Sequence, residues 1–312
     1  MEKRHIGSLE VSVAGLGGNN FGKRADERAT REVVDAALDA GITLFDTADI
    51  YGDGASERLL GQALGTRRDR VVITSKFGMR EPPAGLSGGH PRWVTRACEE
   101  SLRRLGTSFI DLYLLHQPDP STPIGETLRA MNQLVQQGKV REIGCSNFSA
   151  AQLTEAAAAA KERGLRTFVC VQNEYSLLHR EPEEEVLAAC ASLGLAFVPY
   201  FPLASGLLSG KYRRGRAVPA KTRLGGSGER PAEEIIAESK LAAVERLAAF
   251  AEQQGHSLLE LSLSWLASRE PIASVIAGAM TAEQVRANAA ATTAWKLTAE
   301  ELAEVDRLTS DR

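Results

Sequence analysis

The sequence predicts an α/β protein that folds as a single (β/α)8 TIM barrel over residues 1–312. Eight short apolar runs alternate with stretches of helical spacing, and six successive steps are roughly 30 to 40 residues long, the size of a βαβ unit. The runs are rich in Val, Ile, Leu and Phe and do not alternate cleanly, as expected of parallel strands buried on both faces. They are Val13–Leu16, Ile42–Phe45, Val71–Thr74, Ile110–Leu115, Val140–Cys145, Phe168–Val171, Leu195–Tyr200 and Ala273–Ile276.

The two ends of this pattern are special. Before the first run, Gly7 and Ser8 separate two short runs, which predicts a hairpin, with a type II′ turn as one option, that plugs the N-terminal end of the barrel. The step after the seventh strand is roughly twice the usual length of a βαβ unit and holds a long Gly-, Arg- and Ser-rich loop, Tyr212–Arg230, followed by two helices. A doubly wound open sheet is the alternative fold, but it needs only six strands, and no GxGxxG motif follows the first run.

Between the strands, helix boundaries are marked by capping residues. Helical spacing predicts helices over Asp26–Ala40, over Thr127–Gln137 before Gly138, and over Pro182–Ser192 before Gly194. Capping boxes, in which two side chains satisfy the free amide groups of a first turn, are predicted at three further starts. They pair Ser149 with Gln152, Ser257 with Glu260, and Thr298 with Glu301.

The composition is that of an ordinary globular protein. Hydrophobic residues make up 43% and charged residues 25%, and the net charge of −3 gives no reason to expect nucleic acid as a partner. No apolar run is long enough to span a membrane, and Met1–Glu10 carry no signal-peptide pattern. The four cysteines are far apart, which predicts buried free thiols in a cytoplasmic protein: Cys98, Cys145, Cys170 and Cys190. A monomer is the default expectation.

Polar residues follow most of the apolar runs, and in this fold the strand C-termini form the active site. The residues at these ends are Gly17, Gly18, Asn19, Asp46, Lys76, His116, Ser146, Asn147, Gln172, Asn173, Tyr200 and Gly278, and Tyr51 follows Asp46 by five positions. Each has an ordinary structural explanation when taken alone: Asp46 as a turn cap, Lys76 as a solvated loop cation, and His116 as a core histidine. Their convergence on one rim favours a catalytic site.

The motifs at these ends resemble the aldo-keto reductase family. The matching segments, in family order, are Phe45–Glu57, Ile73–Gly78, Asp111–Asp119, Arg141–Phe148, Val171–Ser176, Pro199–Tyr212 and Ala277–Asn288. The resemblance implies reduction of small aldehydes or ketones, with Tyr51 as acid/base, Lys76 as the tuner of its pKa, Asp46 as the partner of the lysine, and His116 as orienting donor. A tyrosine that ordinarily titrates near pH 10 needs roughly 4 kcal/mol to reach a pKa of about 7, and an ammonium about 4 Å away supplies close to that amount.

The resemblance also implies a nicotinamide cofactor, with NADP(H) favoured and NAD(H) as the alternative. Gly18, Asn19 and Asp46 are included among the cofactor positions. Tyr200 would stack on the nicotinamide, Ser146, Asn147 and Gln172 would bind its carboxamide, and the pyrophosphate would meet Leu203, Ser205, Gly206 and Leu208. Lys211 is equally explained as a pyrophosphate partner or as a solvated lysine. The adenosine end would meet Gly278, Met280, Thr281, Gln284 and Asn288, although Thr281 with Gln284 is also a typical helix cap.

The last segment departs from the family pattern. Many members carry Lys or Arg there to pair with the adenosine 2′-phosphate, but here the nearest cation is Arg286, so the preference for NADPH is expected to be weak. Basic residues of the long loop are candidates to replace the missing cation: Arg213, Arg214, Arg216, Lys221 and Arg223. No metal motif is present. A redox-sensing regulatory subunit with little turnover, and an alcohol dehydrogenase using the same residues in reverse, remain alternatives.

Overall fold

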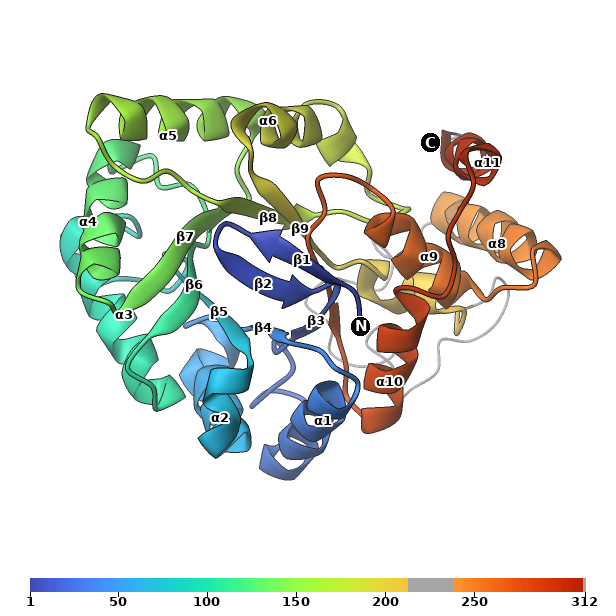
Figure 1. Ribbon diagram of the computed structural model, residues 1–312, viewed down its shortest axis with the longest axis horizontal. Helices are drawn as coiled ribbons and strands as arrows, with labels where there is room; N and C mark the ends of the chain where they lie inside the picture. The colour runs from blue at the N-terminus through green and yellow to red at the C-terminus, as the bar shows by residue number, and fades with distance from the viewer. Residues whose placement is uncertain (213–237, 311–312) are drawn as a thin grey trace.

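A ring of eight parallel strands forms the centre of the protein (Figure 1), which is described here from a computed structural model covering residues 1–212 and 238–310. The strands are β3 (Ala14–Gly17), β4 (Leu44–Asp46), β5 (Val72–Phe77), β6 (Ile110–Leu115), β7 (Val140–Ser146), β8 (Cys170–Glu174), β9 (Ala196–Tyr200) and β10 (Val275–Gly278). From β3 to β9, each strand pairs with the next one in the chain, and the last strand, β10, pairs in parallel with the first strand, β3. A parallel bridge between Phe197 and Ile272 joins β9 to the segment before β10, which confirms the predicted α/β barrel.

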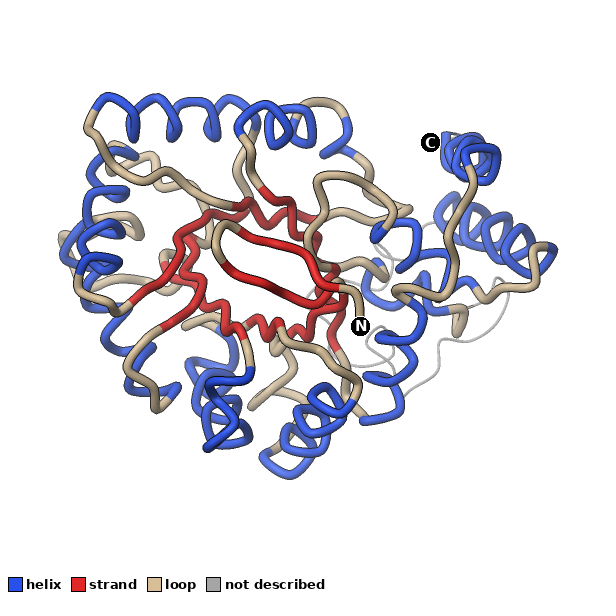
Figure 2. Tube along the Cα trace, viewed as in Figure 1, coloured by secondary structure: helices blue, strands red, loops and turns tan. Residues whose placement is uncertain are grey.

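The predicted N-terminal hairpin is also confirmed. Strands β1 (Lys3–Ile6) and β2 (Leu9–Ser12) pair antiparallel, and Gly7 has a φ of +56°, which this tight turn requires. Ile6, Leu9 and Val11 are buried together with side chains of the barrel interior, such as Leu112. Figure 2 shows the hairpin across the mouth of the ring. Burial of these apolar side chains therefore closes the N-terminal end of the barrel.

Helices surround the ring on its outside (Figure 1). They are α1 (Glu27–Asp39), α2 (Ala55–Leu64), α3 (Pro91–Leu105), α4 (Ile124–Gln136), α5 (Ala150–Glu162), α6 (Val186–Leu193), α8 (Glu238–Gln253), α9 (Leu258–Ala267), α10 (Ala282–Ala291) and α11 (Ala299–Ser310). The larger apolar core lies between the strands and these helices. None of the helices in the described ranges is both long and apolar enough to cross a membrane.

The structure bears out most of the predicted helix boundaries. Asp26 caps α1, and the expected reciprocal capping bonds form at Ser149, Ser257 and Thr298. The predicted helix from Pro182 begins later, at α6, because a short 3-10 turn, η3 (Glu181–Glu183), and the non-helical backbone of Glu185 (φ −141°, ψ −35°) precede it.

Two further expectations have a different outcome. Thr281 caps α10, but the Gln284 side chain accepts from the Met280 N–H, so the reciprocal box expected between Thr281 and Gln284 does not form. The long basic loop after the seventh barrel strand begins at Tyr212, and its residues 213–230 lie outside the described residues.

Candidate active site

Lys76 lies at the centre of a group of polar side chains inside the C-terminal rim of the barrel. Its side chain is 0% exposed, and its Nζ lies 2.7 Å from Asp46 Oδ2, 2.9 Å from the Thr47 carbonyl and 3.4 Å from the Tyr51 hydroxyl. An ammonium has three N–H donors, so these three contacts account for all of them. The structure thus brings three of the predicted tetrad residues into direct contact.

Neighbouring strands place these groups. Asp46 ends β4 and Lys76 lies near the end of β5, and the two strands pair in parallel, so both side chains reach the same rim. Tyr51 begins the short turn η1 (Tyr51–Gly54), in which Gly52, Asp53 and Gly54 all have positive φ values. A side chain at position 54 would also collide with Arg104, because its Cβ would lie 2.6 Å from Arg104 Cδ. The turn therefore requires glycine at this position.

The second oxygen of Asp46 is occupied as well. Gln172 on β8 donates from Nε2 to Asp46 Oδ1 at 2.9 Å, across the barrel from β4. Burial lowers the pKa of Lys76, but the Asp46 carboxylate and the Tyr51 hydroxyl outweigh burial, so the net direction of the pKa shift is upward. The buried lysine therefore keeps its proton.

His116 completes the predicted tetrad. Its ring meets the Tyr51 ring edge to face, with centroids 5.8 Å apart, and its backbone N–H donates to the Phe77 carbonyl at 2.8 Å. Burial, followed by the nearby Lys76 charge, holds the pKa of His116 well below its usual range, so the imidazole is neutral. Its Nδ1 is buried and has no hydrogen-bond partner within the described parts of the chain.

A second polar cluster continues from the tetrad across the ends of β7 to β9. Ser146 Oγ donates to the Gln172 carbonyl at 2.7 Å, and Asn147 Nδ2 donates to the His116 carbonyl at 2.8 Å. The Tyr200 hydroxyl donates to Asn147 Oδ1 at 2.8 Å. Asn147 and Tyr200 border a cavity of about 330 Å³, which is also lined by Asn173. Asn147 Nδ2 also donates to Ser146 Oγ at 3.2 Å, so the four residues predicted for the nicotinamide form one connected hydrogen-bonded cluster.

The residues expected at the pyrophosphate lie in the turn after β9. Ala204, Ser205 and Gly206 have φ values of +44°, +59° and +97° in η4 (Ala204–Ser209). Lys211 folds over this turn, since a Cβ at Gly206 would lie 3.0 Å from its Nζ. Leu203 precedes the turn, and its carbonyl accepts from the Leu208 N–H at 3.2 Å. The Leu208 side chain is buried in the core, so neither its side chain nor its N–H is available to a ligand.

The residues expected at the adenosine end lie where β10 meets α10. Gly278 ends β10 beside Asn19, because a Cβ at Gly278 would lie 3.5 Å from Asn19 Oδ1. Gly18 leaves no room for a side chain, since a Cβ there would lie 3.1 Å from the Asp46 carbonyl and 3.0 Å from Ser56 Oγ. Met280, Thr281, Gln284 and Asn288 occupy the cap and the exposed or half-buried side of α10.

Two further polar residues lie near the site: Asn173, a predicted strand-end residue with no assigned role, and Asp49, which sequence reasoning missed. Asn173 lines the cavity, and its Oδ1 is buried without a partner in the part of the chain that the structure describes. Asp49 is 1% exposed, and neither of its carboxyl oxygens reaches a hydrogen-bond partner among residues 1–212 and 238–310. Asn173 was predicted beside Gln172 at the end of the sixth barrel strand, whereas no sequence signal marks Asp49 as buried.

Comparison with known proteins agrees with this architecture. The family model described as "Aldo/keto reductase family" matches residues 14–310. A probable voltage-gated potassium channel subunit beta from Arabidopsis thaliana is 33% identical, covering 92% of this chain and 90% of its own. An uncharacterized oxidoreductase from Bacillus subtilis is 35% identical, covering 92% of this chain and 89% of the relative. L-glyceraldehyde 3-phosphate reductase from Escherichia coli K12 is 31% identical, covering 100% of this chain and 93% of the relative. Together with the eight-stranded barrel, these matches show that the chain belongs to the aldo/keto reductase family of nicotinamide-dependent oxidoreductases.

Proposed function

We propose that this protein reduces small aldehydes or ketones to alcohols, with Tyr51 as the general acid and NADP(H) as the favoured cofactor. The observation that carries the proposal is the buried Lys76 ammonium, which contacts both the Asp46 carboxylate and the Tyr51 hydroxyl. At 3.4 Å and an effective dielectric of about 20, that ammonium stabilises a negative Tyr51 oxygen by about 5 kcal/mol. Tyr51 is therefore placed to release its proton to a substrate oxygen.

The other members of the tetrad support this proton transfer. Asp46 keeps Lys76 charged despite its burial, and Gln172 holds the second oxygen of Asp46 in place. His116 is neutral, so it carries one N–H, which is available to orient the carbonyl oxygen beside Tyr51. An acid and an orienting donor aimed at the same oxygen are what carbonyl reduction requires.

The chain also has residues that fit a nicotinamide dinucleotide, which when bound supplies the hydride. Tyr200, Asn147 and Ser146 offer a ring face and amide and hydroxyl groups beside the tetrad. The ammonium of Lys211 lies over the turn at Gly206, which provides a positive charge for a diphosphate. In the described part of the segment after β10, Arg286 is the nearest basic residue, and it is exposed. We therefore expect only a small difference between the dissociation constants for NADPH and NADH.

The test of the proposal is consumption of NADPH and NADH, followed by their near-ultraviolet absorbance, across a panel of aldehydes and ketones. Because the Escherichia coli relative is named for a phosphorylated aldehyde, glyceraldehyde 3-phosphate belongs in the panel. Tyr51→Phe should lower turnover by at least about 100-fold, the usual contribution of a general acid, while the dissociation constant for NADPH stays close to that of the wild type. Retention of more than about a tenth of the turnover would remove Tyr51 from this role.

A second candidate is a regulatory subunit that binds the cofactor and turns it over little. The similarity to a plant protein named as a potassium channel subunit favours this alternative. The same panel separates the two functions. A regulatory subunit would bind NADPH tightly and convert at most about one equivalent, whereas a reductase consumes the cofactor in many turnovers.

A further inference from the structure

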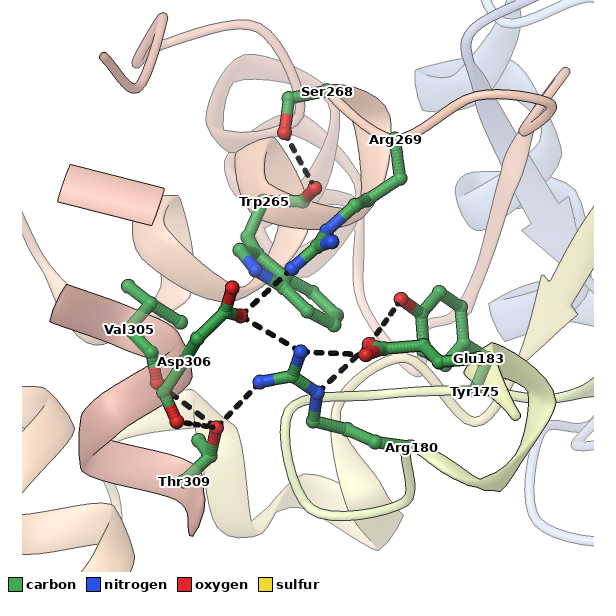
Figure 3. A network of polar contacts seen from close by, with 9 residues as sticks. All are labelled: Tyr175, Arg180, Glu183, Trp265, Ser268, Arg269, Val305, Asp306 and Thr309. Atoms are coloured by element: carbon green, nitrogen blue, oxygen red, sulfur yellow. Dashed lines mark hydrogen bonds and ion pairs between the residues drawn. The ribbon is translucent and has the colours of Figure 1, made fainter. Parts of the chain in front are cut away.

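The C-terminal helix is attached to the loop between β8 and α6 by one arginine (Figure 3). Arg180 donates to Asp306 Oδ1 at 2.7 Å and to Thr309 Oγ1 at 2.6 Å, both on α11. Within its own loop, the Arg180 guanidinium donates hydrogen bonds to both carboxylate oxygens of Glu183, at 2.7 and 2.6 Å. Asp306 also accepts from Arg269 at 2.9 Å. These charge-assisted bonds join three segments that are distant in the sequence.

The network continues from Glu183 toward the site. Glu183 Oε1 accepts from the hydroxyl of Tyr175 at 2.7 Å, and the Tyr175 ring is fully buried. The backbone N–H of Tyr175 donates to the Tyr200 carbonyl at 3.3 Å. Tyr200 in turn donates to Asn147. Tyr175 is thus fixed by its side chain on one side and holds the backbone of Tyr200 on the other.

The same loop forms a wall of the cavity beside Tyr200. His179, Glu181 and Pro182, which flank Arg180, line that cavity together with Asn147 and Tyr200. A displacement of Arg180 would therefore change both the backbone support of Tyr200 and the wall that faces it.

Trp265 restricts such a displacement. Its ring lies between the guanidinium groups of Arg180, 5.2 Å from the centroid, and Arg269, 4.6 Å away, and it also packs against the Tyr175 ring. The Arg180 side chain is 13% exposed and the Asp306 side chain is 45% exposed, so their ion pair is shielded from solvent on the arginine side and partly screened on the other. The arrangement holds Arg180 in one position as long as α11 is docked.

We propose that Asp306 is a positioning residue that acts through Arg180, Glu183 and Tyr175 to hold Tyr200 in place for the nicotinamide ring. This inference rests on the proposed function, because the stacking of Tyr200 on nicotinamide is part of that proposal. It adds that docking of the C-terminal helix sets the affinity for the nicotinamide half of the dinucleotide, and leaves the adenosine half unaffected.

The test is isothermal titration of wild type, Asp306→Asn and Asp306→Ala with NADPH and, separately, with 2′-phospho-ADP-ribose, which lacks nicotinamide. Both variants should bind NADPH about five- to tenfold more weakly, the usual size of a coupling between sites, and should bind the fragment as the wild type does. Asp306→Glu, which keeps the charge, should recover part of the affinity. Melting temperatures of all variants show whether α11 remains folded onto the barrel.

Glu304→Ala is the matched control, since Glu304 pairs with Arg307 on the same helix outside this network. It should change neither affinity. NADPH binding by Asp306→Ala equal to that of the wild type would overturn the inference, and so would an equal weakening of the fragment, which would indicate general loosening. If the wild-type protein binds NADPH no more tightly than it binds the fragment that lacks nicotinamide, that result would instead contradict the proposed function.

Discussion

Asp46 and Asp49 are separated by two residues, and both are buried, yet their surroundings are opposite. Asp46 has an ammonium on one oxygen and an amide on the other. Within the described residues the carboxyl oxygens of Asp49 have no hydrogen-bond partner. The backbone N–H of Asp49 donates to the Lys76 carbonyl at 3.1 Å, so Asp46 and Asp49 lie beside the same strand end. Burial alone therefore does not decide the charge of a carboxyl group, whereas its partners do.

The charges around Asp49 explain the difference. Burial raises its pKa most, and the Glu57 carboxylate on α2 raises it further, while the charges of Arg104 and Arg80 oppose them, so the pKa reaches about 7. Glu57 is 0% exposed and is itself held by Ser75 at 2.5 Å and by Arg104 at 2.6 Å. The nearby Tyr113 hydroxyl on β6 is buried, and burial raises its pKa well above its usual range, so it stays neutral and adds no second negative charge beside Asp49.

The largest effect is expected when the paired carboxylate loses its partner. Lys76→Met should lower turnover more than about 100-fold, and it should cost about 3–5 kcal/mol of stability because Asp46 is left charged and buried. Steady-state kinetics and urea unfolding measure the two losses. The double variant Lys76→Met with Asp46→Asn should recover much of the stability and none of the activity. A double variant as unstable as the single one would show that the Asp46 charge is not the cause.

A smaller, pH-dependent effect is expected at Asp49. The folded protein holds this proton up to about pH 7, whereas the unfolded chain releases it near the ordinary aspartate value of 3.8. The stabilisation is therefore complete below pH 3.8, decreases as pH rises, and is lost above about pH 7. Asp49→Asn, which stays neutral, should be more stable than the wild type at pH 8 by about 4 kcal/mol and nearly equal to it at pH 4. Thermal unfolding across this pH range measures the difference, and parallel curves for the two proteins would contradict it.

The smallest effect is expected at the exposed carboxylate of the same turn. Asp53 pairs with Arg80 at 2.9 Å, but its side chain is 85% exposed. Solvent screens such a pair, so Asp53→Asn should change the free energy of unfolding by less than about 0.5 kcal/mol at any pH. Urea titration is the measurement. A loss comparable with that of Lys76→Met would mean that the pair holds the Tyr51 turn in place.

The meeting of Asp46, Tyr51, Lys76 and His116 at one rim could be predicted because a parallel barrel places the C-termini of all its strands at the same end, whereas their catalytic roles stay a prediction. The strand limits were less accurate: β5 was expected over Val71–Thr74 but continues to Phe77. Ser75 and Lys76 are polar and look like loop residues, yet both are buried. Their burial is possible because Ser75 donates a hydrogen bond to Glu57 and Lys76 donates one to Asp46. Apolar patterning does not detect strands that end in paired polar residues.

Contacts between distant segments could not be predicted from the sequence. The environment of Asp49 depends on Glu57 and Arg104 from two different helices. The bond between Arg180 and Asp306 joins residues 126 positions apart. Such pairs leave no periodic signal along the chain, so only their geometry identifies them. The long basic loop proposed to reach the 2′-phosphate stays a prediction.

The hairpin that seals the barrel has a practical consequence. Because β1 and β2 close one end of the described ring, reactants would reach Lys76 and Tyr51 through the opposite end. Met1 is 46% exposed on the sealed end. A purification tag or a linkage to a solid support joined there would leave the entrance unobstructed, so the immobilised catalyst should work as fast as the free one.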